Sequence, residues 1–81
     1  MTVRVLFFST LRTITDREWL EKDYTSPITV AELLDDLYEE FPPLKDWNER
    51  LLIAVDLAYA SRETSLGDGQ EVALMPPVQG G

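Results

Sequence analysis

The order of the predicted elements indicates an α+β fold, in which a sheet packs one of its faces on a single main helix. Three observations predict it: apolar strand-like runs lie near both ends of the chain, one segment between them has helical spacing, and a Gly-Asp-Gly turn precedes the last run. The chain has 81 residues, and a domain of that size buries roughly 60% of its unfolded surface. We therefore expect one core and no separate catalytic lobe.

The first predicted strand runs from Thr2 to Ser9 and is rich in β-branched and aromatic residues. A short connection, Leu11 to Asp16, leads from it to a weaker strand around Glu18 to Tyr24. Alternation along the first strand places apolar side chains on both of its faces: Val3, Val5 and Phe7 on one, and Leu6 and Phe8 beside Arg4 on the other.

The clearest element is an amphipathic helix that begins with a Thr-x-x-Glu capping box, Thr29 to Glu32, and ends at Pro42-Pro43. Its apolar residues recur at helical spacing: Val30, Leu33, Leu34, Leu37, Tyr38 and Phe41. Four carboxylates lie away from this stripe and have no histidine or cysteine companion: Asp35, Asp36, Glu39 and Glu40. We interpret them as a solvated face and predict no metal site.

The next part of the chain predicts a pair of strands. Leu44 to Arg50 is an irregular or short helical link, and its Trp47 is a core or edge-covering aromatic residue. Leu51 to Leu57 is a strand rich in Leu, Ile, Ala and Val. Ala58-Tyr59-Ala60 is a short return strand after a tight turn near Asp56.

The last strand leaves one face of the sheet without a helix. Gly67-Asp68-Gly69 is a turn signal, and Glu71 to Met75 is the strand that follows. Because one helix covers only one sheet face, Leu6, Phe8 and Met75 then point to the other side. A contiguous exposed apolar patch is commonly an interaction surface. The alternative is that one of the two tryptophans, or a loop, folds over this face within the monomer.

Composition limits the classes of function. Fifteen acidic against seven basic residues give a net charge of −8, which repels nucleic acid and anionic membranes and suits a basic protein partner, or simply keeps the chain soluble. The sequence has no Cys and no His, so it lacks a thiol nucleophile and a side chain that titrates unperturbed near neutral pH. We expect no self-sufficient enzyme and no bound cofactor. Without a signal-peptide pattern or a long apolar run, a cytoplasmic location is expected.

The last six residues, Pro76-Pro77-Val78-Gln79-Gly80-Gly81, form the strongest candidate functional segment. The prolines hold it extended, and glycines without Cβ atoms can pass through a narrow channel. From Pro77 to Gly81 the reach is at most roughly 17 Å, enough to enter a neighbouring protein's active site. The chemistry is then expected at the Gly81 carboxylate. On its own, the Gly-Gly pair also fits a frayed terminus or a cloning scar.

The run from Gly67 to Gly81, GDGQEVALMPPVQGG, resembles the turn, last strand and tail of the ubiquitin-like sulfur carriers, and among them the small subunits of molybdopterin synthase. Val5-Leu6-Phe7-Phe8 followed by Leu11-Arg12 is similar to the opening strand of that family. The resemblance implies a ubiquitin-like β-grasp domain over residues 1–76 and a flexible C-terminal tail over 77–81. Three residues depart from the usual glycine, asparagine and phenylalanine of the family: Asp16, Asp56 and Met75.

The resemblance also implies a carrier cycle. An adenylating enzyme of the ubiquitin-activating type activates the Gly81 carboxylate with ATP, and a sulfur donor protein converts the adenylate to a thiocarboxylate. The large subunit of molybdopterin synthase then uses this sulfur on a cyclic pterin phosphate. An α-carboxyl group has an ordinary pKa of roughly 3.5, so it is ionised at neutral pH and resists nucleophiles until it is activated.

In that cycle Gly81 carries the sulfur, and Gly80 gives the tail clearance. Pro76, Pro77 and Val78 position the tail, which also contains Gln79. The resemblance implies that three residues dock the partner. Phe8 and Met75 are already placed by alternation on the sheet face without a helix, and Tyr59 rests on the apolar residue that the family has there.

Three other interpretations stay open. The chain also fits a sulfur carrier for thiamine thiazole or tungsten-cofactor synthesis, although the Pro-Pro pair favours the pterin pathway. It fits a ubiquitin-like modifier, whose Gly81 would form an isopeptide bond with a lysine of a target protein; lysine conjugates in cells would identify this class. The last is a plain interaction domain with an inert tail, whose terminal glycines can be deleted without effect.

Overall fold

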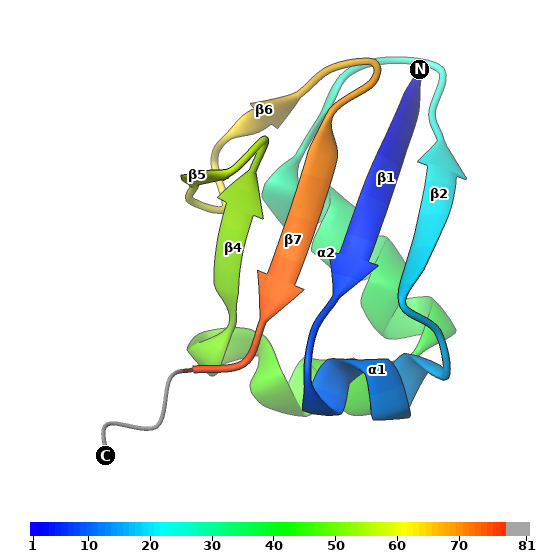
Figure 1. Ribbon diagram of the computed structural model, residues 1–81. Helices are drawn as coiled ribbons and strands as arrows, with labels where there is room; N and C mark the ends of the chain where they lie inside the picture. Colours follow the sequence, from blue (N-terminus) through cyan, green and yellow to red (C-terminus); the bar gives the residue numbers. More distant parts are fainter. Residues whose placement is uncertain (78–81) are drawn as a thin grey trace.

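The computed structural model describes residues 1–77, and Figure 1 shows a sheet with one long helix behind it. β1 (Thr2–Phe7) lies between β2 (Trp19–Asp23), to which it is antiparallel, and β7 (Glu71–Met75), to which it is parallel. β7 pairs antiparallel with β4 (Leu52–Val55), and β4 with β5 (Ala58–Tyr59). The order across this five-stranded sheet is β2-β1-β7-β4-β5. A mixed sheet on one main helix confirms the predicted α+β class.

The long helix, α2 (Val30–Glu40), begins at the predicted capping box. The Glu32 backbone N–H donates to the Thr29 hydroxyl at 3.2 Å, and the Thr29 backbone N–H donates to the Glu32 carboxylate at 2.9 Å. These two bonds satisfy backbone donors that the first turn leaves without helical partners. The buried face of α2 is the predicted apolar stripe: Val30, Leu33, Leu34 and Leu37.

The core lies between α2 and the sheet face that α2 covers. The alternate residues predicted for this face are all 0–1% exposed: Val3, Val5, Phe7, Val72 and Leu74. Phe7 also meets Phe41 edge to face, with ring centroids 6.2 Å apart. Full burial of a side chain of this kind contributes roughly 1.5–3 kcal/mol by transfer from water, so this face contributes strongly to the stability of the fold.

The predicted connection from Leu11 to Asp16 is instead a short helix, α1 (Thr10–Thr15). Leu11 is buried, and its N–H donates to the Phe8 carbonyl at 3.1 Å. The prediction was wrong because six residues are too few to show a helical period. The first strand also ends at Phe7 and not at Ser9, whose φ of 55° turns the chain toward α1.

The second half follows the predicted order of elements, with differences in their bounds. The link is a 3-10 helix, η1 (Pro42–Arg50), and its Trp47 packs partly buried against the core, as expected. β4 ends at Val55, two residues before the predicted end, because Asp56 and Leu57 both have positive φ and form the turn to β5.

A second, two-stranded sheet was not predicted. It pairs β3 (Ile28–Thr29) with β6 (Ser65–Leu66), and two-residue strands carry no alternation signal. The predicted turn before β7 is present: Gly69 has a φ of 81°, and its N–H donates to the Thr2 carbonyl at 2.8 Å. Glycine suits this place because a Cβ atom disfavours the left-handed region.

Candidate functional site

The sheet face opposite α2 carries an apolar row across its full width. The register places one row of paired residues over all five strands: Trp19, Leu6, Ala73, Ala54 and Tyr59. Residues that pair directly across strands point to the same side of a sheet. We call this side, together with Phe8, Leu57 and Met75, the open face.

Part of the open face is hollowed into a groove of about 300 Å³. Ala54 and Ala73 are direct partners on neighbouring strands, and their small side chains leave the middle of the groove low. Larger side chains complete the lining: Phe8, Leu57, Tyr59 and Met75. The structure therefore brings together all three residues that were predicted to dock a partner.

Neither tryptophan covers this groove. Trp47 packs against the core, and Trp19 lies toward the β2 edge of the open face with 49% of its surface exposed. The Arg4 guanidinium stacks on the Trp19 ring at 4.5 Å and pairs with the Glu21 carboxylate at 3.6 Å. Within residues 1–77, the alternative in which a tryptophan folds over the groove is therefore wrong, and the groove is accessible: Tyr59 is 80% exposed and Phe8 is 36% exposed.

Among the larger side chains that line the groove, the sequence prediction missed one, Leu57. Placed at the end of a predicted strand, it lies instead in the β4–β5 turn, 96% exposed and with a φ of 72°. The sequence did contain a signal for this turn. Asp56-Leu57 separates two strand-like runs, and two-residue turns of this kind prefer Asp-Gly or Asn-Gly, so an aspartate at the first position indicates a turn.

The groove reaches the point where the chain leaves the sheet. Met75, the last residue of β7, pairs with Leu52, and the Phe8 backbone N–H donates to the Leu74 carbonyl at 3.2 Å. Phe8 and Met75 thus flank the segment that continues into Pro76 and Pro77, both half-buried. The other predicted tail residues lie outside the described residues: Val78, Gln79, Gly80 and Gly81.

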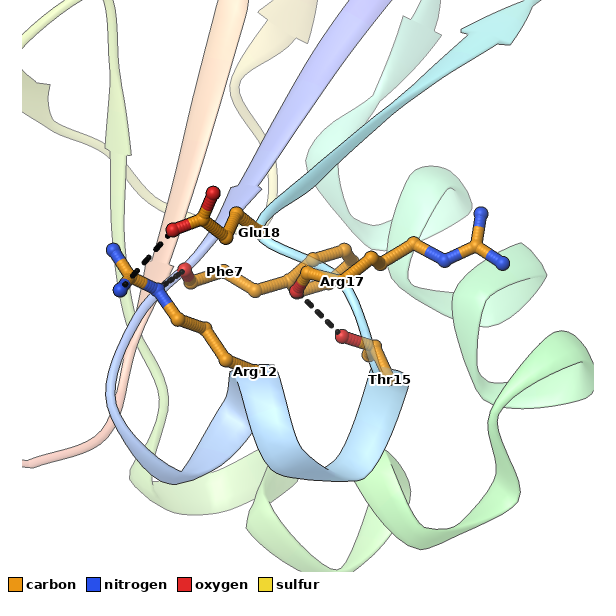
Figure 2. A network of polar contacts seen from close by, with 5 residues as sticks. All are labelled: Phe7, Arg12, Thr15, Arg17 and Glu18. Atoms are coloured by element: carbon orange, nitrogen blue, oxygen red, sulfur yellow. Dashed lines mark hydrogen bonds and ion pairs between the residues drawn. The ribbon is translucent and has the colours of Figure 1, made fainter.

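The charge around the groove is mixed. Figure 2 shows the Arg12 side chain pointing from α1 toward the end of β1. Its Nε donates to the Phe7 carbonyl at 3.0 Å, and one of its terminal nitrogens lies 3.6 Å from the Glu18 carboxylate. This holds the guanidinium 5.6 Å from the Phe8 ring centroid. Asp56 lies in the turn beside Leu57. A partner bound at Phe8 therefore meets the Arg12 cation, whereas the Asp56 carboxylate is bonded to Gln70 and Glu71 at the start of β7.

The predicted solvated face of α2 binds its own neighbours. Within residues 1–77 no cluster of three or more carboxylates suits a metal ion. The Tyr24 hydroxyl donates to the Asp36 carboxylate at 2.7 Å, and Lys22 lies 2.6 Å from Glu40. Burial raises the pKa of Tyr24, and the bond to Asp36 raises it further; burial also raises the pKa of Tyr38.

No helix in the described part of the chain has the length and apolar character to cross a membrane.

Known proteins resemble the chain over almost its whole length. The ThiS family matches residues 5–81. The molybdopterin synthase sulfur carrier subunit of Mycobacterium tuberculosis is 38% identical over 80 residues, which cover 98% of this chain and 96% of that protein. A structure of subunits 1 and 2 of the molybdopterin-converting factor from Helicobacter pylori contains a chain that is 29% identical, with a TM-score of 0.70 and full coverage of both chains.

The fold itself matches more distant proteins. SAMP1 from Haloferax volcanii has a TM-score of 0.88 at 22% identity, and the match covers 100% of each chain. At this identity the likeness speaks for the fold alone. It confirms the predicted ubiquitin-like β-grasp architecture.

Proposed function

This chain belongs to the ThiS family, and we propose that it is the sulfur carrier of a molybdopterin synthase, with the sulfur held as a thiocarboxylate at Gly81. The observation that carries the proposal is the position of the groove, which reaches the place where the chain leaves β7 toward Gly80-Gly81. A partner bound in the groove would receive the tail directly. We expect the cycle to run in the cytoplasm.

The chemistry begins with activation of the Gly81 carboxylate by an adenylating partner. The carboxylate oxygen attacks the α-phosphorus of ATP, and pyrophosphate leaves. The terminal sulfur of a persulfide on the donor protein then attacks the acyl carbon, and AMP leaves to give an acyl disulfide. A thiol reductant cleaves the S–S bond of this acyl disulfide, so the carrier keeps the sulfur as a thiocarboxylate and the donor sulfur leaves in a disulfide with the thiol. ATP binds to the adenylating enzyme in this proposal, and the carrier chain itself holds no cofactor.

Docking is the contribution of the folded domain. Phe8, Tyr59 and Met75 present apolar surface in the groove, and burying such side chains against a partner is favourable by roughly 1.5–3 kcal/mol each. We propose that the large synthase subunit binds here, supported by the H. pylori relative, whose structure is a complex of subunits 1 and 2. Pro76 and Pro77 then direct the tail away from the sheet, because proline disfavours a return by further strand pairing.

The test is sulfur transfer with an altered terminus. Deletion of Gly81, or a tag fused after it, should abolish transfer to the pterin substrate while circular dichroism and melting temperature stay unchanged. Removal of the tag to regenerate Gly80-Gly81 is the matched control and should restore transfer. Normal cofactor synthesis by a chain with a permanent tag would contradict the proposal.

Gly80 offers a finer test of the same tail. The methyl group of Gly80→Ala restricts φ and widens the chain where it must pass a partner's backbone. Adenylation or sulfur transfer should therefore slow in single-turnover measurements, although the domain stays folded. Unchanged rates for both steps would mean that Gly80 serves only as a flexible link.

A further inference from the structure

The β4–β5 turn carries a leucine, Leu57, that adds nothing to the core of the isolated domain. Leu57 is 96% exposed, the highest value among the large exposed apolar side chains within residues 1–77. Its φ of 72° lies in the left-handed region, where the Cβ atom of an L-residue is crowded. Both its exposure and its backbone conformation are unfavourable for the free protein.

Neither feature follows from the needs of the turn. A two-residue turn with positive φ at both positions is best served by Asn-Gly or Asp-Gly. Asp56 fits the first position, and glycine would relieve the second. Leucine gains no core contact there, since almost all of its surface faces solvent. Strained residues of this kind persist mainly at sites of function.

The turn holds Leu57 in a fixed position. The Asp56 backbone N–H donates to the Glu71 carbonyl at 2.9 Å, and the Asp56 carboxylate accepts the Glu71 N–H at 3.0 Å and the Gln70 side-chain amide at 3.2 Å. These three bonds tie the turn to the start of β7. A side chain on a rigid turn loses less conformational entropy on binding than one on a mobile loop.

We propose that Leu57 is a docking anchor, which inserts into an apolar pocket of the large synthase subunit. This rests on the proposed function, and it extends the docking surface because Leu57 lines the same groove as Phe8 and Met75. The occupant is a different protein and not a second copy or a membrane. A net charge of −8 on each copy opposes self-association, and the same charge repels anionic lipid.

The experiment measures calorimetric affinity for the large subunit together with thermal unfolding of the free carrier. Leu57→Asn and Leu57→Gly remove the apolar side chain and relieve the backbone, so affinity should fall about tenfold or more while the melting temperature stays equal or rises. Leu57→Met keeps an apolar side chain and should bind within about threefold of the natural chain. Asp16→Gly relieves another positive φ, of 57°, outside the groove, and should leave affinity unchanged.

Two results would overturn the proposal. Affinities of Leu57→Asn and Leu57→Gly within about twofold of the natural chain would remove the anchor while leaving the sulfur carrier intact. A clear loss of melting temperature in both variants would assign Leu57 to the stability of the domain. If the natural chain itself fails to bind the large subunit, the proposed function fails, and the anchor with it.

Discussion

The two faces of the main sheet are built from the same strands but serve different ends. Phe7, toward α2, is 1% exposed, whereas its neighbour Phe8, on the open face, is 36% exposed. Alternation along a strand separates adjacent residues in this way. In a chain of 81 residues, one face can therefore supply stability and the other a binding surface, and substitutions on the two faces should affect different measurements.

The largest effect is expected on the covered face. Phe7→Ala removes a ring that is fully buried against Phe41, so the free energy of unfolding should fall by about 3–5 kcal/mol. Urea unfolding followed by circular dichroism measures this loss. Because small domains have only about 5–15 kcal/mol in total, much of the variant should be unfolded at elevated temperature. A loss below about 1 kcal/mol would mean that the core is not centred on this face.

The matching change on the open face should leave the fold intact. Phe8→Asp and Met75→Asp place a carboxylate in the groove, so association with the large subunit should weaken about tenfold or more, with little change in melting temperature. Ser26→Asp, at an exposed residue that does not line the groove, is the control for added charge. A large drop in melting temperature with unaltered affinity would place Phe8 and Met75 in the core of the monomer.

A smaller effect is expected at the start of α2. Thr29→Ala removes the hydroxyl that accepts the Glu32 N–H, and the loss of such a cap lowers the free energy of unfolding by about 1 kcal/mol. Thr29→Ser keeps the hydroxyl and should restore most of it. Affinity for the partner should not change in either variant, since Thr29 lies outside the groove. Equal stability of the alanine variant and the natural chain would show that the cap is dispensable.

The smallest effect concerns alkaline pH. Burial first, and then the bond to Asp36, raises the pKa of Tyr24, so the folded state favours the neutral phenol. This contribution to stability is complete below about pH 10 and is lost as the pH rises above it. Melting temperatures from about pH 8 to about pH 11 should fall less steeply for Tyr24→Phe than for the natural chain. Identical slopes would mean that Tyr24 does not cause the loss of stability at alkaline pH. Tyr38 would then be the remaining candidate, because burial raises its pKa as well.

The sequence predicted best the elements whose signals are local. The capping box of α2 is contained in four residues, and β7 was bounded correctly by a glycine turn and a proline pair. The open face was predicted from the alternation of side chains along the strands and from the presence of one long helix, which covers only one face of the sheet. Its docking residues Phe8 and Met75 therefore came from geometry, whereas Tyr59 came only from the family resemblance.

The parts that were missed depend on distant contacts. α1 has six residues and is held by Leu11 in the core and by the Arg12 bond to Phe7, neither of which a local pattern contains. β3 and β6 exist only because they pair with each other. Leu57 continues the apolar run that predicted a strand, and its positive φ could not be expected because leucine rarely adopts one. The division at residue 76 and the roles of residues 78–81 stay predictions.

The most direct test of the sulfur-carrier proposal is the intact mass of the protein isolated from its native host under mild, non-reducing conditions. We predict a population whose mass corresponds to replacement of one oxygen by sulfur, with fragmentation that localises the change to Gly81. This population should increase when transfer to the large subunit is blocked. A chain that carries only an oxygen carboxylate under that block, or sulfur placed elsewhere in the sequence, would contradict the proposal.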